Sequence, residues 1–175
     1  FISEQNQTNL EVDIVLPSLK IKTNSNEYES YLTYITGEQL AEIYEIYGQK
    51  LFEQNVRAFL QFRGNVNKGL KNTIKYNPEK FFAYNNGITA TATEVNTDEE
   101  GNIIHIENLQ IVNGGQTTSA IYAARKLNKI DVTDINVQMK LSVVRDKEKQ
   151  DDFVSKVSEY ANTQNKVNKS DFFSN

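Results

Sequence analysis

The segment QIVNGGQTTSA, residues 110–120, is the most informative part of this 175-residue sequence. A β-prone apolar run leads into Gly114 and Gly115, and a helix is predicted over 117–128. Glycines permit a tight turn and let a ligand approach the backbone closely. The first turn of a helix adds free N–H groups and the positive end of the helix dipole, which attract anions.

This strand–turn–helix junction predicts a phosphate- or nucleotide-binding site. It is not a Walker A loop, because Gly-Lys-Ser/Thr does not follow the glycines. A tight turn whose hydroxyl groups only cap the helix explains the same residues, and both interpretations stay open. The candidate binding residues are Asn113, Gly114, Gly115, Gln116, Thr117 and Thr118.

Two further segments concentrate side-chain amides, YNNGIT at 84–89 and ANTQNKVN at 161–168. An amide donates and accepts hydrogen bonds at once, so neighbouring Asn and Gln residues suit the recognition of bases and amides. Asn-Gly also favours a plain turn, and amides after a helix also satisfy its last carbonyl groups. We predict a polar cleft lined by Asn85, Asn86, Asn162, Gln164 and Asn165.

The flanking residues alternate between strand-like and helix-like periods. Strands are expected over 10–16, 31–35, 88–95, 103–112 and 135–144. Helices are expected over 37–47, 66–76, 117–128 and 147–161. Thr36 and Gln39 form a predicted capping box, and residues 55–62 are expected to be extended.

Interspersed strands and helices indicate a mixed α/β (α+β) fold with a single mixed sheet flanked by helices. No linker rich in Pro, Gly or Ser divides the chain, so we expect one domain over residues 1–175. The sequence begins at Phe1 and stops within a polar run, which we interpret as a fragment of a longer protein.

The composition argues against several chemistries. The chain has no Cys and one His, His105, which excludes disulfides, cysteine nucleophiles and multi-His metal sites. We therefore expect no metal site and a structural role for His105. It holds 21 Asn and 11 Gln, and amides do not exchange protons at neutral pH, so recognition is favoured over hydrolysis. No apolar run is long enough to span a membrane.

The net charge of −4 conceals one basic segment. Residues 57–80 hold six Lys or Arg and one Glu, whereas residues 1–56 hold three basic and nine acidic residues. Phe59, Phe62 and Tyr76 interleave with the basic residues, a pattern that suits a nucleic-acid backbone. A solvated helix face explains the same charges. The candidate nucleic-acid-binding residues are Arg57, Arg63, Lys68, Lys71 and Lys75.

Four motifs in this order resemble the AIPR family, the abortive infection phage resistance proteins of bacteria. They are Asn55–Arg57 (NVR), Phe82–Thr89 (FAYNNGIT), Ile111–Thr118 (IVNGGQTT) and Ala161–Asn165 (ANTQN). The resemblance covers roughly residues 40–175. It implies a cytoplasmic antiviral protein and specifies no reaction.

A fainter similarity links the Gly115–Gln116 pair to the phosphate-binding turn of ParB-like and sulfiredoxin-like domains, and implies a fold of that kind. In those families His and Arg follow the turn, whereas this chain has Thr117 and Thr118. The cationic phosphate clamp of those families is therefore missing at this point, and their Cys chemistry is absent.

The leading hypothesis is a nucleic-acid- or nucleotide-binding core domain of a phage-resistance protein. Its expected partners are DNA or RNA and other defence-system proteins, with no membrane contact and no cofactor other than a nucleotide. One alternative is a metal-dependent nuclease or nucleotide hydrolase using carboxylates such as Glu53, Glu107 or Asp171. Another alternative is a protein-interaction scaffold of a defence complex. The sequence leaves open whether the chain is an enzyme.

Overall fold

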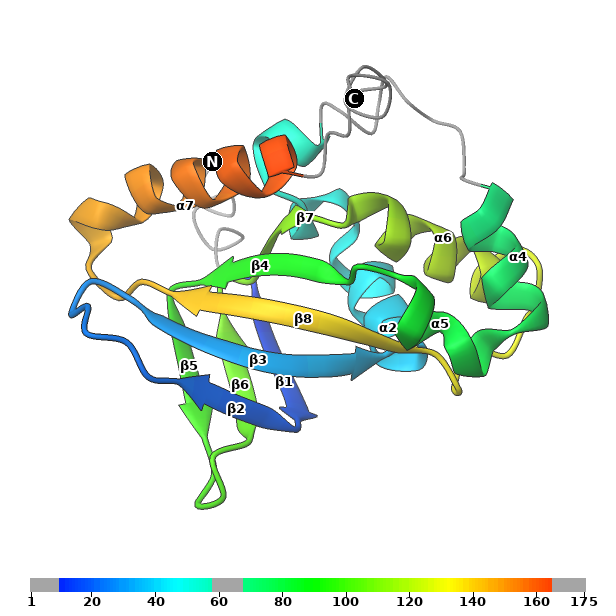
Figure 1. Cartoon of the computed structure of the whole chain (residues 1–175), viewed down its shortest axis with the longest axis horizontal. Helices are drawn as coiled ribbons and strands as arrows, with labels where there is room; N and C mark the ends of the chain where they lie inside the picture. The colour runs from blue at the N-terminus through cyan, green and yellow to red at the C-terminus, as the bar shows by residue number, and fades with distance from the viewer. Residues whose placement is uncertain (1–9, 58–67, 165–175) are drawn as a thin grey trace, which may run out of the picture.

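The computed structural model describes residues 10–57 and 68–164 (Figure 1). Its strands are β1 (Glu11–Leu16), β2 (Ser18–Ile21), β3 (Glu29–Thr36), β4 (Ile88–Ala92), β5 (Glu94–Thr97), β6 (Ile103–Glu107), β7 (Gln110–Asn113) and β8 (Asn136–Val143). Its α-helices are α2 (Gly37–Tyr47), α4 (Lys68–Tyr76), α5 (Phe81–Tyr84), α6 (Gly115–Lys126) and α7 (Lys147–Gln164), with short 3-10 helices η1 (Gly48–Leu51) and η2 (Pro78–Lys80). The mixed α/β class is confirmed.

The described strands form two sheets, whereas we expected one. A three-stranded antiparallel sheet has the order β1-β6-β5, and a five-stranded sheet has the order β2-β3-β8-β4-β7. The division falls within the hairpin expected over 88–112. β4 pairs with β7 in the larger sheet, and the next stretch of the same hairpin, β5 with β6, belongs to the smaller sheet.

The hairpin changes sheet at Thr93 and Asn108. Asn108 has a φ of 56°, a conformation that Asn tolerates better than most residues, and its N–H donates to the Leu10 carbonyl at 2.7 Å. Thr93 donates its N–H to the Glu107 carbonyl at 3.0 Å. The alternation of apolar residues continues on both sides of this bend, so the sequence pattern alone does not reveal it.

β8 lies at the centre of the five-stranded sheet, antiparallel to β3 and parallel to β4. Val137, Met139 and Leu141 point into the core, and Gln138 and Lys140 lie on the exposed face. This is the alternation expected for a strand with one buried face.

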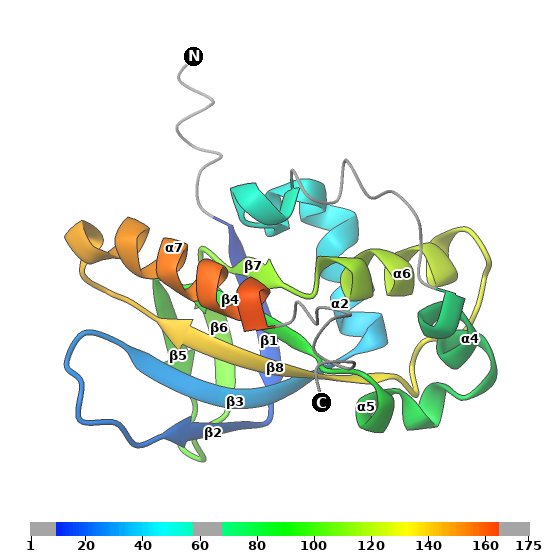
Figure 2. The same ribbon diagram turned by 45° about the horizontal axis from the view of Figure 1, so that its top comes forward.

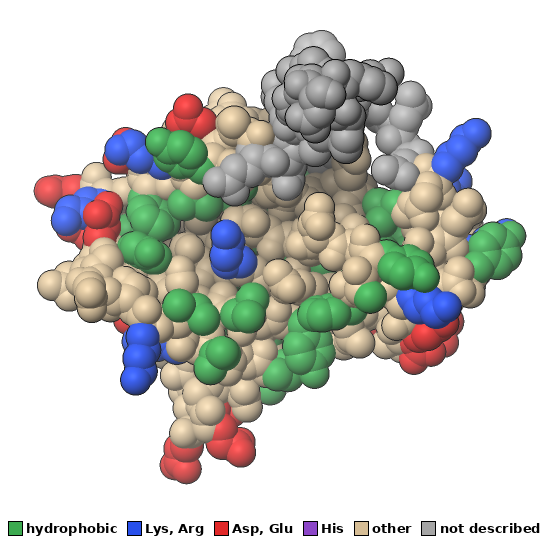
Figure 3. Space-filling model, in the orientation of Figure 1, with side chains coloured by type: hydrophobic (Ala, Val, Ile, Leu, Met, Phe, Trp, Pro, Cys, Tyr) green, Lys and Arg blue, Asp and Glu red, His purple; other side chains and the backbone are tan. Residues whose placement is uncertain are grey.

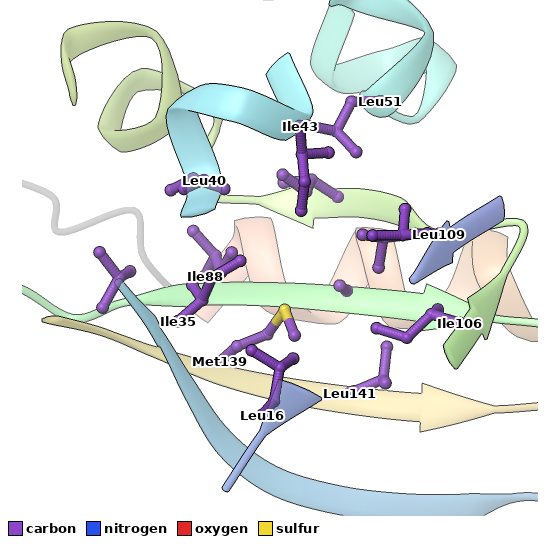
Figure 4. Packing of buried hydrophobic residues seen from close by; sticks show 14 of the residues in the cluster. Leu16, Ile35, Leu40, Ile43, Leu51, Ile88, Ile106, Leu109, Met139 and Leu141 are labelled. Atoms are coloured by element: carbon purple, nitrogen blue, oxygen red, sulfur yellow. The ribbon is translucent and has the colours of Figure 1, made fainter. Parts of the chain in front are cut away.

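The core lies between the two sheets and α2 (Figure 4). Side chains from β1, β6, β8 and α2 meet there, including Leu16, Ile106, Met139, Leu141, Leu40 and Ile43. Figure 2 shows α7 beside β4 and β7, and α4 and α5 at the other end of the molecule near α6. α7 therefore packs against β7, whereas α5 packs against β8 and α4 against α6.

The helix starts show where local sequence was informative and where it was not. The capping box is confirmed, because Gln39 N–H donates to Thr36 Oγ1 at 3.1 Å and Thr36 N–H to Gln39 Oε1 at 3.0 Å. The extended structure expected over 55–62 is wrong for residues 55–57, which are helical, and residues 58–62 lie outside the described residues. Glu53 accounts for this, since its carboxylate accepts the Asn55 N–H at 2.9 Å.

Among the described residues no helix has the length and apolar character that crossing a membrane would require.

Two glycines let three segments approach closely around the start of α6. Gly114 has a φ of 97°, and a Cβ there would lie 2.5 Å from Ile88 Cγ2 and 3.0 Å from the Gly87 carbonyl. Gly87 has a φ of 85°, and a Cβ there would collide with the Gln138 carbonyl of β8. The β7–α6 turn, the turn before β4 and the start of β8 therefore stack without intervening side chains.

Gly114→Ala should lower the free energy of unfolding by at least about 2 kcal/mol, because left-handed backbone strain adds to a steric clash. Gly101→Ala is the matched control, since Gly101 has a φ of 90° but a Cβ there would meet nothing within 4 Å. We expect the control to lose only about 1 kcal/mol. Urea denaturation of both variants measures the difference, and equal losses would contradict the close approach at Gly114.

Candidate functional site

Three segments that are distant in sequence meet where α6 begins. Asn113 Nδ2 donates to Asn162 Oδ1 of α7 at 2.8 Å, and Asn85 Nδ2 donates to Thr117 Oγ1 at 3.3 Å. We call Asn85, Asn113, Thr117 and Asn162 the amide cluster. In Figure 1 the end of α7, the end of β7 and the start of α6 lie side by side. The structure thus brings together one described residue or more from each amide-rich segment.

Asn162 fastens the end of α7 to β7. Its Nδ2 donates to the Val112 carbonyl at 3.1 Å and to the Ser158 carbonyl at 2.7 Å. Ser158, one turn earlier, is buried and donates its hydroxyl to Glu53 Oε1 at 3.3 Å. The Asn162 amide is therefore engaged on both its donor and its acceptor side. Asn165 and the side chain of Gln164 lie outside the described residues.

The α6 start combines internal hydrogen bonds with unpaired donors. Thr118 is fully buried, and its hydroxyl and N–H both donate to the Gly114 carbonyl, at 3.3 and 3.2 Å. Thr117 is also buried and accepts the Asn85 amide. Within the described residues no acceptor meets the N–H groups of residues 115–117. The two threonines therefore shape the turn, and Gly115 and Thr117 are both buried in it.

A lysine that sequence reasoning missed stands beside the amide cluster. Strand register places Thr89 of β4 between Asn113 of β7 and Lys140 of β8. Adjacent strands are about 4.8 Å apart, so the Lys140 backbone is about 10 Å from that of Asn113, within reach of a lysine side chain and a small ligand. Lys140 is exposed, and no described carboxylate pairs with it. Its alternation with Met139 and Leu141 was the signal that could have identified it.

The exposed face of the larger sheet is mixed in character. Figure 3 shows a basic side chain in the middle of this face, hydrophobic side chains beside it and acidic side chains towards the margins. The register places the exposed Leu32 of β3 opposite Lys140. A groove of about 870 Å³ between α7 and this face reaches Thr89 and Lys140. It is also lined by Tyr28 and Phe153, whose ring centroids are 5.1 Å apart, and by Tyr160.

The predicted basic residues do not form one patch with the amide cluster. Lys68, Lys71 and Lys75 are exposed on α4. α4 packs through the buried Ile74 against the C-terminal half of α6, in a shallow pocket that includes Leu127. These lysines therefore lie beside the far half of α6. Arg63, Phe59 and Phe62 lie outside the described residues.

Arg57 lies in a different cleft from the α4 lysines. One guanidinium nitrogen donates to the Phe52 carbonyl at 3.0 Å, and the buried Nε has no hydrogen-bond partner among the described residues. The cleft, of about 980 Å³, lies between residues 47–57 and the first half of α7. Its lining is mixed in charge, since Lys50 and Arg57 face Glu53 and Asp151.

His105 lies on the outer face of the smaller sheet, among carboxylates. Its Nδ1 is 2.6 Å from Asp13 Oδ1, and its Nε2 is 3.3 Å from Glu11 Oε1. The hydrogen bond to Asp13, together with these carboxylates, raises the pKa of His105 above its usual value. Glu107 belongs to this group, whereas Glu53 contacts Ser158 instead, and Asp171 lies outside the described residues.

Comparison with known proteins identifies one family. The model of the AIPR protein family matches residues 52–175. Neither the curated proteins nor the solved structures gave a match to the chain. The similarity to ParB-like and sulfiredoxin-like domains at Gly115–Gln116 therefore stays a prediction from sequence.

Asn162→Ala should lower the free energy of unfolding by about 1–2 kcal/mol, because it removes the hydrogen bonds that hold α7 on β7. Amide hydrogen exchange in the last turns of α7 should become faster. Thr163→Ala is the control, since Thr163 is exposed and makes no hydrogen bond to the described residues. Thr and Asn have similar helix propensities, so both substitutions by Ala change the propensity by a similar amount. Similar exchange rates in the two variants would show that Asn162 does not fasten α7.

Proposed function

The chain belongs to the AIPR family, the abortive infection phage resistance proteins, and on this basis we propose that it is the nucleotide- or nucleic-acid-binding core of such a protein. The ligand's phosphate would lie against the first turn of α6, beside the amide cluster. The observation that carries the proposal is the meeting of all three amide-rich segments at this one point. We expect the protein to act in the cytoplasm.

The polar residues around the cluster divide into two groups. Asn85, Asn113 and Asn162 use their amides to hold the segments together. Asn86 and Gln116, by contrast, make no hydrogen bond through their side chains among the described residues, and Asn86 is exposed. A recognition site needs rigid supporting groups and free contacting groups, and this division supplies both.

The charge arrangement suits a phosphate ester more than a metal-bound substrate. The N–H groups of residues 115–117 have no acceptor among the described residues, and the positive end of the α6 dipole lies at the same point. Lys140 supplies the cation that the glycine turn itself lacks. The nearest carboxylate with a printed link to the amide cluster, that of Glu53, reaches it through Ser158 and accepts the Ser158 hydroxyl. Neutral amides and the ring of Tyr160 in the adjoining groove suit a base.

Lys140→Gln should weaken binding of a phosphate-bearing ligand at least tenfold, since it removes a charge-assisted contact of about 1.5–3 kcal/mol. Thermal shift measures the binding of nucleoside triphosphates, and fluorescence anisotropy measures the binding of a labelled single-stranded oligonucleotide. If the site binds a nucleotide, the triphosphates raise the unfolding temperature of the protein. If the site binds a nucleic-acid strand, the oligonucleotide binds with an affinity that falls as the salt concentration rises.

Lys147→Gln is the matched control for Lys140→Gln, because Lys147 is an exposed lysine at the start of α7, away from the cluster. Asn86→Ala should weaken binding without lowering the unfolding temperature of the free protein. If Lys140→Gln and Lys147→Gln bind every probe as the unaltered protein does, the site is not at the start of α6.

Charge reversal of Lys68, Lys71 and Lys75 to Glu separates the two ligand types. The α4 lysines lie beside the far half of α6, so they can contact an extended strand but not a small molecule bound at the α6 start. We expect the oligonucleotide to bind more weakly and to release about three fewer counterions, as read from the slope of log affinity against log salt concentration. Triphosphate binding should stay unchanged. Unchanged oligonucleotide binding would remove α4 from the interface.

A further inference from the structure

The outer face of the three-stranded sheet gathers one imidazole and three carboxylates. Antiparallel pairing sets Glu11 opposite Glu107 and Asp13 opposite His105. Directly opposed residues share a face of the sheet, so all four side chains project to the same side. Val12 and Ile106, between them in sequence, are buried and face the core.

The two ring nitrogens of His105 have different surroundings. Nδ1 is 2.6 Å from Asp13 Oδ1, a short hydrogen bond that sets the orientation of the ring. Nε2 faces Glu11 Oε1 at 3.3 Å and Glu107 Oε2 at 3.8 Å. Histidines that bind metals are held in this way, with one nitrogen hydrogen-bonded to a carboxylate and the other directed at further ligands.

The group carries more negative charge than its neighbours balance. Within the described residues no Lys or Arg lies within 4.0 Å of Glu11, Asp13 or Glu107. Glu94 of the adjoining β5, which the register sets opposite Glu107, is by contrast paired with Arg145. Even a protonated His105 would balance only one of the three carboxylates. The side chain of Glu11 is 54 % exposed and that of Glu107 44 %, so an ion from solvent can reach them.

We propose that Glu11, His105 and Glu107 bind a divalent transition-metal ion of the Zn²⁺ type, with Asp13 as a positioning residue for the imidazole. The three ligand atoms lie within 4.8 Å of one another. A tetrahedral zinc with bonds of about 2.1 Å needs ligand atoms about 3.4 Å apart, which small rotations of exposed side chains provide. An imidazole favours Zn²⁺ over Mg²⁺ or Ca²⁺, which prefer oxygen ligands alone.

The site is independent of the amide cluster, on a different sheet and with different residues. It also differs from the structural role that the sequence predicted for His105. The leading sequence hypothesis assigned no metal, whereas the metal-dependent alternative named Glu107 without His105 or Glu11. Residues 11, 13, 105 and 107 come from two strands that are far apart in the chain, so their spacing in the sequence does not predict that they form a group.

The test uses the fact that His105 is the one histidine of the sequence. An untagged protein labelled with ¹⁵N gives a single imidazole spin system in NMR spectra. Stoichiometric Zn²⁺ should shift the Nε2 resonance strongly while Nδ1 stays protonated towards Asp13, and Mg²⁺ should leave both unchanged. Titration calorimetry in parallel gives the affinity and the stoichiometry.

His105→Gln and Glu107→Gln should each weaken Zn²⁺ binding at least about tenfold, and Asp13→Asn should weaken it by about 10–100-fold. In Asp13→Asn the Nε2 resonance of His105 should still shift at saturating Zn²⁺, as befits a positioning residue. Glu148→Gln, an exposed carboxylate on α7, is the control and should bind as the unaltered protein does. Circular dichroism confirms that each variant is folded.

Two results would overturn the proposal. In one, Zn²⁺ leaves the His105 resonances in place, so any ion bound lies elsewhere on the acidic surface. In the other, the folded His105→Gln and Glu107→Gln variants bind Zn²⁺ with unaltered affinity.

Discussion

The contact of Gly114 with Gly87, and of Gly87 with the backbone of β8, is the constraint on which the candidate site depends. Each glycine has a positive φ and no room for a Cβ, so the turns that contain them can stack on the central strand. This stacking brings Asn85 to Thr117 at the first turn of α6. The same two positions thus combine a packing requirement with an open backbone, which a larger residue would remove.

Much of the fold was predictable because its signals are local. The capping box needs only Thr36 and Gln39, and the alternation in β8 is visible within eight residues. The division into two sheets was not predictable, because it depends on the bend at Asn108 and on its bond to Leu10, about a hundred residues away. The polar cleft was predicted from the composition of the amide segments, whereas Lys140 lies near the amide cluster only through the register of β4 with β8.

The amide bias of the sequence has a physical use in this arrangement. Asn162 donates to two carbonyl groups and accepts from Asn113, so one side chain connects a helix and a strand without a net charge. A Lys or Glu in its place would carry a charge next to the α6 start and change the electrostatic potential there. Uncharged connectors therefore leave the electrostatic character of the site to the helix dipole and to Lys140.

The pairing of β3 with β8 also governs when the larger sheet can exist at all. Ser30 and Ser142, which share a hydrogen bond across these strands, are 112 residues apart in the chain. During synthesis on a ribosome, β2 and β3 emerge early, and β8, the partner of β3, is translated about a hundred residues later. Long-range pairing of this kind is slow and leaves strand edges exposed meanwhile. A product that terminates before β8 therefore lacks the strand joining β3 to β4, and it loses the sheet as a whole.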